Sequence, residues 1–276
     1  MKRESVCVWL LYKTIPGRGV LKFLVRPGFS RMMGRYLDSS FSRWLVHRYI
    51  RKYRIDMTEY ENTEYTSFNS FFTRKRKRSV QVLDGTPEHL ISPCDGVLTV
   101  YRIEKEGRYW IKNVEYSVSE LLQDEKLAEI YQGGFCFVFR LTPQNYHRYC
   151  YVDDGIETNR VCIDGILHCV RPIACETNPV FIQNSRSYVV METVNFGKLI
   201  QMEVGALLVG KISNYPVRTQ VFRGDEKGYF EFGGSTIILF LEKGRILPEQ
   251  RLMKNSLRGI ETSVRLGERI AAKIKR

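Results

Sequence analysis

The chain has 276 residues, of which 43% are hydrophobic and 12% aromatic, so it can bury one substantial core and its composition excludes a disordered chain. Lys and Arg number 43 against 30 Asp and Glu, a net charge of +13, and residues 1–80 hold 18 of these cations but only 6 of the acids. A basic N-terminal region on a nearly neutral body predicts contact with an anionic surface, either a membrane or a nucleic acid.

The seven cysteines include no Cys-x-x-Cys pair and match neither a disulfide framework nor a zinc motif, so we expect reduced thiols and no metal. Residues 6–12 form an apolar run that is too short to span a bilayer, and Lys13 follows it where a signal peptide would have small residues. The closest group of metal-ligating residue types has no common metal spacing and comprises Cys162, His168, Cys169 and Cys175.

Residues 20–53 mix apolar and aromatic side chains with many arginines, and Ser39 or Ser40 is placed to cap a helix over residues 41–54. Amphipathic helices with aromatic residues on one face and Arg on the other suit a lipid interface. Alternatively, the apolar face packs on the core or on a partner subunit while the arginines are solvated, and the two interpretations are compatible. Helical spacing is kept by Leu37, Phe41, Trp44, Leu45, Arg48 and Tyr49.

An aromatic segment at residues 65–73 runs directly into five consecutive cations at residues 74–78. These cations are expected either to bind phosphates of lipid or nucleic acid or to form a solvated loop. The globular body should begin near Val80. The sequence therefore predicts a basic amphipathic helical region at 1–80 and a β-rich domain at 81–276.

From residue 90 onward the sequence is typical of short strands separated by Gly, Asn and Asp turns. One helical insert is expected over residues 118–131. Many short strands favour a mainly antiparallel β body, and the amphipathic N-terminal helices make the fold class α+β. The predicted strands are residues 97–101, 135–141, 161–170, 188–194, 199–212 and 237–241.

Three polar clusters interrupt the apolar strands. A Ser-Pro-Cys-Asp-Gly turn delivers the carboxylate of Asp95, a Tyr-His-Arg-Tyr string places His147 after a buried strand, and a Gly-Gly-Ser-Thr turn exposes the backbone carbonyl before Ser235. Each cluster alone is also an ordinary turn or a structural residue. Together they could supply an acid, a base and a nucleophile, whose order along the chain is free in such triads.

These strings, with Val-Gly-Ala-x-x-Val-Gly at residues 204–210 and Phe-Asn-Ser-Phe-Phe-Thr-Arg at residues 68–74, occur in the order of a known family. Over about residues 65–265 the chain resembles the pyruvoyl-dependent phosphatidylserine decarboxylases. The Tyr-His-Arg-Tyr-Cys-Tyr form at residues 146–151 looks most like the clostridial-type branch of that family.

The resemblance implies that Asp95 and His147 activate the Ser235 hydroxyl, which attacks the carbonyl of Gly234. The resulting ester eliminates, and hydrolysis of the new N-terminus at residue 235 releases ammonia, which gives a β chain (1–234), an α chain (235–276) and a covalent pyruvoyl cofactor derived from Ser235. Phosphatidylserine then forms a Schiff base with this group and loses CO2 to give phosphatidylethanolamine. His147 is the expected proton donor, because an ordinary histidine pKa of about 6.5 permits exchange near neutrality.

One position departs from the family pattern, because many members carry a second histidine where this chain has Cys150. His147 could serve both steps, Cys150 could take the second role, or His168 could reach the site. A cysteine is a poor general base unless its pKa is depressed, which favours His147 and then His168. Arg148 and Lys211 are candidates for contacting the phosphodiester.

For partners and location, the sequence and the resemblance predict a peripheral enzyme on the cytoplasmic side of the cell membrane, docked on anionic lipid through residues 1–80. They also imply a further dimer through the N-terminal helices, and no nucleic-acid partner. A pyruvoyl enzyme for a soluble amino acid would have no use for the basic helices. A nucleic-acid-binding protein would use the charge but would leave Gly-Gly-Ser-Thr and Tyr-His-Arg without a role.

Overall fold

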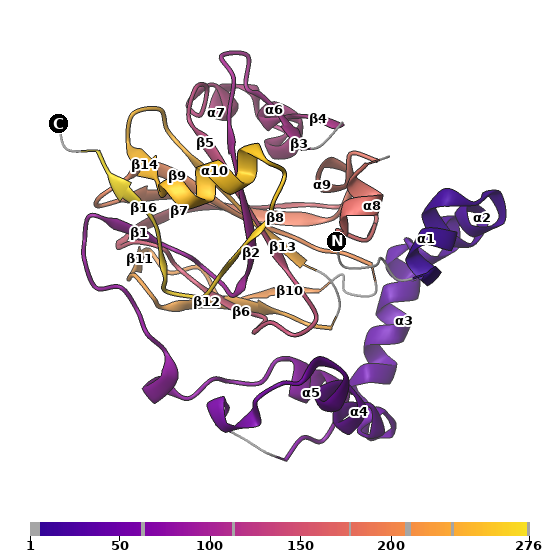
Figure 1. Cartoon of the computed structure of the whole chain (residues 1–276). Helices are drawn as coiled ribbons and strands as arrows, with labels where there is room; N and C mark the ends of the chain where they lie inside the picture. Colours follow the sequence, from indigo (N-terminus) through magenta and orange to yellow (C-terminus); the bar gives the residue numbers. More distant parts are fainter. Residues whose placement is uncertain are drawn as a thin grey trace.

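A computed structural model describes residues 6–61, 64–111, 114–176, 178–207, 211–232 and 235–274. The N-terminal helices lie to one side of a β body, and α3 connects the pair α1–α2 to the pair α4–α5 (Figure 1). The α+β fold class is therefore confirmed. None of the described helices is both long and apolar enough to cross a bilayer. The N-terminal helices are α1 (Val6–Lys13), α2 (Ile15–Leu24), α3 (Pro27–Asp38), α4 (Trp44–Tyr53) and α5 (Phe68–Phe72).

Helix α4 is shorter than the helix predicted at residues 41–54. A 3-10 turn, η1 (Ser40–Ser42), precedes it, and Arg54 ends it in the left-handed conformation with φ 51°. The Ser42 hydroxyl donates to the carbonyl of Leu37 at 2.9 Å and accepts the Phe68 amide at the same distance. These contacts fix the chain before α4 and tie it to the start of α5.

The apolar residues of the N-terminal helices divide into two sets. The inward set forms a small core of its own, in which Leu37 and Val46 pack with the aromatic rings of α5. The outward set includes Phe41 and Trp44, which are 81% and 53% exposed. Core packing and an exposed aromatic surface thus occur on the same helices.

The main sheet of the body has eight antiparallel strands, and its central strand is the apolar run that follows the Gly-Gly-Ser turn. Strand β13 lies between β5 and β9 and is hydrogen bonded to both. In sheet order the strands are β11 (Gln220–Val221), β7 (Gly155–Ile163), β8 (Arg186–Thr193), β9 (Gly197–Val204), β13 (Ser235–Leu241), β5 (Phe135–Leu141), β2 (Gly96–Arg102) and β15 (Thr262–Val264).

A hydrophobic core covers each face of this sheet. Successive side chains of a strand point to opposite faces, so Ile237 and Leu239 of β13 enter one core while Ile238 and Phe240 enter the other. All seven residues of β13 are buried as a result. This explains why the run from residue 237 is continuously apolar instead of alternating.

Smaller elements surround the main sheet. The predicted insert at 118–131 is two short helices, because Gln123 turns left-handed with φ 53° and Asp124 caps the second helix by accepting the Leu127 amide. The smaller strands are β1 (His89–Ile91), β3 (Arg108–Ile111), β4 (Val114–Ser117), β6 (Arg148–Cys150), β10 (Ile212–Asn214), β12 (Glu226–Phe230), β14 (Ile246–Pro248) and β16 (Arg269–Lys273). The remaining helices are η2 (Met57–Glu59), η3 (Arg78–Val80), α6 (Val118–Leu122), α7 (Glu125–Glu129), α8 (Pro172–Cys175), α9 (Val180–Gln183) and α10 (Gln250–Leu257).

Two predicted strands have other bounds in the structure. Strand β7 begins at Gly155 and ends at Ile163, where residues 161–170 were predicted, and β9 begins at Gly197 and ends at Val204, where residues 199–212 were predicted. Pairing places Ile163, Val204 and Ser235 at the same end of the sheet. The segments that leave this end, at 142–147, 164–170 and 205–207, therefore lie around the start of β13.

Candidate active site

Ser235 is the first residue of β13, whereas the sequence placed it in the turn before the strand. It is fully buried and pairs with Leu141, the last residue of β5. Its Oγ atom is buried and has no hydrogen-bond partner among the described residues. Such an orphaned hydroxyl is costly, because a buried polar group without a partner loses its hydration without compensation. Gly234, the other half of the predicted cleavage site, lies outside the described residues.

His147 is tied to the segment that leads to Ser235. The Phe230 amide at the end of β12 donates to the His147 carbonyl at 2.9 Å, and Ser235 pairs with Leu141, six residues before His147. Helix α5 closes the other side, since the Phe72 ring lies 4.1 Å from the His147 ring and 5.2 Å from that of Phe232. The segment between Phe230 and Ser235 thus begins next to the His147 backbone and ends opposite Leu141 of β5.

The His147 imidazole is held in one neutral tautomer. It is 1% exposed, and its Nδ1 atom lies 2.9 Å from the carbonyl oxygen of Asn145. A carbonyl oxygen only accepts, so Nδ1 carries the proton and Nε2 carries a lone pair. Nε2 is buried and has no partner among the described residues. The ring therefore presents a free basic nitrogen.

The electrostatics of His147 differ from the ordinary histidine on which the sequence prediction rested. Burial, and then the charge of Arg74, lower the pKa of His147 to about 3, although its bond to the Asn145 carbonyl acts in the opposite direction. The imidazole is neutral at pH 7. In the uncut chain it can accept a proton but holds none to donate from Nε2.

Asp95 has partners other than His147. Both carboxylate oxygens contact the Arg76 guanidinium, at 2.6 and 3.3 Å, and one oxygen also accepts the Leu266 amide at 2.9 Å. Arg76 lies over the ring of Tyr146 at 4.7 Å. Burial alone would lower the pKa of Arg76, but the hydrogen bonds and charge of Asp95 more than offset this and raise it. Asp95 is therefore connected to the His147 loop through Arg76 and Tyr146.

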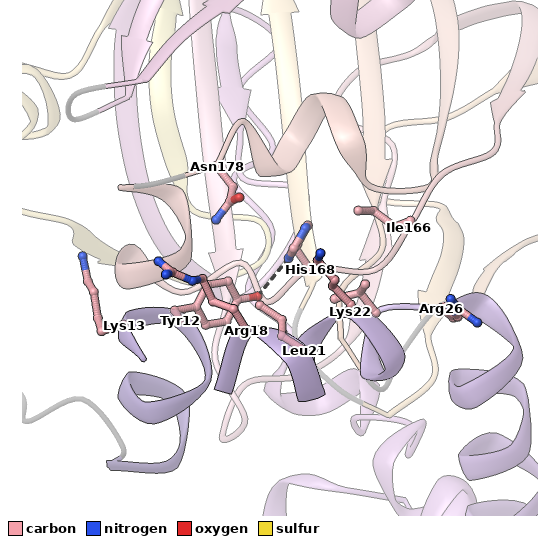
Figure 2. A pocket seen from close by; sticks show the side chains of 10 residues that line it. Tyr12, Lys13, Arg18, Leu21, Lys22, Arg26, Ile166, His168 and Asn178 are labelled. Carbon is pink, nitrogen blue, oxygen red and sulfur yellow. Dashed lines mark hydrogen bonds between the residues drawn. The ribbon is translucent and has the colours of Figure 1, made fainter. Parts of the chain in front are cut away.

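The two alternative bases have different surroundings. Cys150 is buried in β6, and burial raises the pKa of its thiol to about 12, so almost no thiolate exists at neutral pH. His168 lies in the segment after β7, where its carbonyl accepts the Leu207 amide at 3.2 Å and its Nδ1 atom is 3.2 Å from the Tyr12 hydroxyl (Figure 2). Neither arrangement resembles the free nitrogen of His147.

Sequence reasoning missed a buried ion pair beside Ser235. Glu203 pairs with Ile237 across the β9–β13 ladder, two residues along from Ser235 on the same face. Its carboxylate accepts from the Lys227 ammonium at 2.7 Å, and both side chains are fully buried. Burial lowers the pKa of Lys227, while Glu203 opposes the shift. The only sequence signal of this pair is Lys227 itself, a lysine in a segment for which the sequence predicts no strand.

The five cations at residues 74–78 differ in burial and in partners. The sequence alone therefore does not single out Arg76. Arg74 is 3% exposed and stacks on Tyr60 at 4.3 Å, whereas the other cations of the run apart from Arg76 are exposed. The candidate phosphodiester contacts are both occupied by acids, since Arg148 pairs with Glu226 and Lys211 with Glu231, each at 2.5 Å.

A buried serine hydroxyl at the start of a central strand, in a chain that also holds a neutral histidine with a free nitrogen, suits an enzyme that works by serine-centred acyl transfer. No group of three or more His, Cys, Asp or Glu suited to hold a metal ion occurs in the part of the chain that the structure describes. Comparison with known proteins narrows this class of enzyme to one family. The family model "Phosphatidylserine decarboxylase" matches residues 68–272, and the chain belongs to this family.

Similar proteins come from species of Clostridium. The chain is 47% identical over 262 residues to phosphatidylserine decarboxylase proenzyme 2 of Clostridium acetobutylicum, which covers 94% of this chain and 89% of the relative. It is 38% identical over 277 residues to the phosphatidylserine decarboxylase proenzyme of Clostridium novyi, covering 98% and 94%. A proenzyme of Clostridium botulinum (strain Kyoto) is 38% identical over 268 residues, covering 95% and 91%.

Proposed function

We propose that the chain is a phosphatidylserine decarboxylase proenzyme that cuts its own backbone between Gly234 and Ser235. The observation that carries the proposal is the buried Ser235 hydroxyl, which has no hydrogen-bond partner among the described residues, in a chain similar to decarboxylase proenzymes. The products are a β chain of residues 1–234 and an α chain of residues 235–276. Ser235 then becomes a pyruvoyl group, so the cofactor needs no separate binding pocket.

His147 acts as the base for self-cleavage in this proposal. Its Nε2 lone pair accepts the Ser235 proton as the hydroxyl attacks the Gly234 carbonyl, and the Asn145 carbonyl holds the ring in the required tautomer. The low pKa of His147 weakens it as a base in the resting chain. The proton is therefore held only transiently and passes on to the departing nitrogen.

Asp95 and Arg76 are assigned positioning roles. Their ion pair, together with the stack of Arg76 on Tyr146, holds the loop that carries His147. A direct charge relay from Asp95 to His147 stays a prediction of the family resemblance. The Lys227–Glu203 pair keeps the face around Ser235 polar but electrically balanced.

For decarboxylation, a pyruvoyl group supplies an electron-accepting carbonyl that a lipid amine can engage. In support of this, no described residue makes a competing hydrogen bond to the Ser235 hydroxyl. His147 remains the proposed proton donor to the decarboxylated carbon. That role requires the cut site to raise its pKa from the value in the uncut chain, and entry of water or a lipid phosphate would act in that direction.

Membrane docking is proposed for residues 1–80. The outer faces of α1 and α2 carry exposed apolar side chains among the cations, and Ile15 and Phe23 are 79% and 59% exposed. Such a surface suits the cytoplasmic leaflet of the cell membrane, where the substrate phosphatidylserine is anionic. A further dimer through the N-terminal helices stays a prediction.

Intact mass of the purified protein tests the proposal, with Ser235→Ala as the control. We expect two fragments for the natural chain, the smaller one beginning in pyruvoyl at position 235, and one uncut chain for the variant. Release of CO2 from phosphatidylserine vesicles, but not from free serine, completes the test. A single uncut natural chain would refute self-cleavage, and turnover of free serine would favour a soluble substrate.

A further inference from the structure

A second polar region lies away from Ser235, in a cavity of about 700 Å³ between α2 and the segment that follows β7 (Figure 2). None of the proposed catalytic residues Asp95, His147 and Ser235 lines it. The cavity is bordered by Tyr12, Lys13, Arg18, Leu21, Lys22, Val25, Arg26, Ile166, His168 and Asn178.

The cavity is strongly cationic. Four of its ten lining residues are Lys or Arg, and none is Asp or Glu. Lys13 has a partially exposed ion pair with Glu176 at 3.6 Å, but Arg18, Lys22 and Arg26 have no ion pair with any residue in the described part of the chain. Arg18 and Lys22 lie four residues apart on α2, where like charges repel, and Arg26 follows just beyond the end of that helix. A bound anion would relieve that repulsion.

The opposite wall adds a neutral hydrogen-bond donor. The Tyr12 hydroxyl accepts the Cys169 amide at 2.9 Å and lies 3.2 Å from His168 Nδ1. Burial raises the pKa of Tyr12 and lowers that of His168, so both side chains are neutral at pH 7. In the tautomer in which the Tyr12 hydroxyl donates to Nδ1, the second ring nitrogen of His168 carries a hydrogen that can be donated to an anion.

The surroundings of the cavity select for an amphipathic anion. Leu21 and Val25 add apolar walls between the cations. On the outer face of the same helix, Val20 and Phe23 are more than half exposed. A soluble phosphate compound needs no such apolar rim, whereas a phospholipid has both a charged phosphodiester and acyl chains that the rim can contact.

We propose that this cavity binds the phosphodiester of an anionic membrane phospholipid at a site separate from Ser235. The cavity wall is linked to the catalytic end of the sheet, since the Asn184 side-chain amide donates to the carbonyls of both His168 and Gly205, at 2.8 and 2.7 Å. Gly205 follows β9, the neighbour of β13. A lipid in the cavity therefore orients this end of the sheet toward the membrane surface.

The inference goes beyond the proposed function and does not depend on it, so the test uses the full uncut chain carrying Ser235→Ala. The probe is dihexanoyl phosphatidylglycerol below its micelle concentration, measured by titration calorimetry at physiological salt. A monomeric lipid reports a discrete site, whereas diffuse attraction to a charged vesicle does not. We expect one lipid per chain.

Matched double variants distinguish lipid binding at this cavity from nonspecific attraction to the positive charge of the protein. Arg18→Ala with Lys22→Ala should weaken lipid binding at least tenfold. Lys254→Ala with Arg258→Ala removes the same two residue types at the same spacing, from α10 and from the residue that follows its end, where both are exposed, and should change binding less than twofold. Ile166→Trp fills the cavity at constant charge and should also weaken binding at least tenfold.

Inorganic phosphate identifies the source of the anion. At the same concentrations it should not displace the lipid, because it lacks the acyl chains that contact the apolar walls. Equal binding of phosphate would overturn the lipid assignment. The site itself is refuted if the uncut chain binds no monomeric lipid, or if the α10 variant loses as much affinity as the α2 variant.

Discussion

Two polar regions lie at the same end of the large sheet, and they differ in whether their charged side chains have partners of opposite charge. Around Ser235 the proposed catalytic groups carry no unpaired charge, since His147 is neutral and Asp95 is paired with Arg76. In the α2 cavity, by contrast, Arg18 and Lys22 face open space with no acidic partner in the described chain. A reaction that moves protons needs groups whose charge is controlled. A site that binds an anion needs cationic side chains without acidic partners.

The largest expected effect concerns the free nitrogen in the balanced region. His147→Gln removes the proposed base and should slow self-cleavage by about 10²- to 10⁴-fold, the range for loss of a general base. The measurement is the cleaved fraction against time after cell-free synthesis. His89→Gln is the control, because His89 lies in β1 and pairs with Asp84. Cleavage of His147→Gln at the natural rate would remove the base from the mechanism.

The ion pair between Asp95 and Arg76 can be broken by a substitution at either residue. Both side chains are about nine-tenths buried, so Arg76→Met or Asp95→Asn should lower the free energy of unfolding by about 3 kcal/mol. Urea unfolding in the uncut Ser235→Ala chain gives the values. Arg78→Met, at an exposed cation of the same basic run, should cost less than about 0.5 kcal/mol.

The double variant sharpens this comparison. Arg76→Met with Asp95→Asn should cost clearly less than the two single changes together, because neither charge is then left buried alone. Additive costs would show that the pair contributes nothing as a pair. Recovery of stability without recovery of self-cleavage, measured in a chain that keeps Ser235, would assign Asp95 a role in the reaction beyond holding Arg76.

A smaller effect follows from the neutral state of His147. Its pKa is about 3 in the folded chain and about 6.5 when unfolded, so between these values the unfolded chain binds a proton that the folded chain does not. Stability should therefore fall as the pH drops below 6.5, by about 2 kcal/mol at pH 5. In the uncut Ser235→Ala chain, adding His147→Gln should remove this part of the pH dependence. If the slope of stability against pH does not change, a group other than His147 is responsible for it.

The smallest effect is expected at the position where the family pattern is broken. Cys150→Ala should change the self-cleavage rate less than about twofold, because burial keeps the thiol protonated and unable to act as a base. The assay is the time course used for His147. A folded Cys150→Ala chain that no longer cuts itself would show that the thiol has a direct role.

Strands with strong local signals were predicted well. The continuous apolar runs at residues 135–141 and 237–241 are parts of β5 and β13, since a strand buried on both faces needs no alternation. Residues 164–170 were assigned to a strand because they are apolar too. In the structure they pack against the N-terminal helices, with the Leu167 amide bonded to the Val25 carbonyl, and a contact so distant in sequence leaves no local pattern.

The candidate site was predictable where a residue type carries the chemistry and not where the chemistry depends on a partner. His147 and Ser235 stand out as a histidine after a strand and a hydroxyl after two glycines. That Asp95 pairs with Arg76, and that Glu203 pairs with Lys227, depends on which strands and loops become neighbours. The spacing of residues along the chain does not indicate which strands and loops become neighbours.

The position of β13 has a consequence for the proposed two-chain product. A cut before Ser235 creates a new chain end in the middle of a sheet, yet it creates no new sheet edge, because β5 and β9 remain bonded to both sides of β13. Residues 235–276 are also woven into the larger fragment through β15 on β2 and β16 on β1. Separating the fragments would require breaking several ladders at once, so the nicked protein should survive intact through purification and resist edge-to-edge aggregation as well as the uncut chain does.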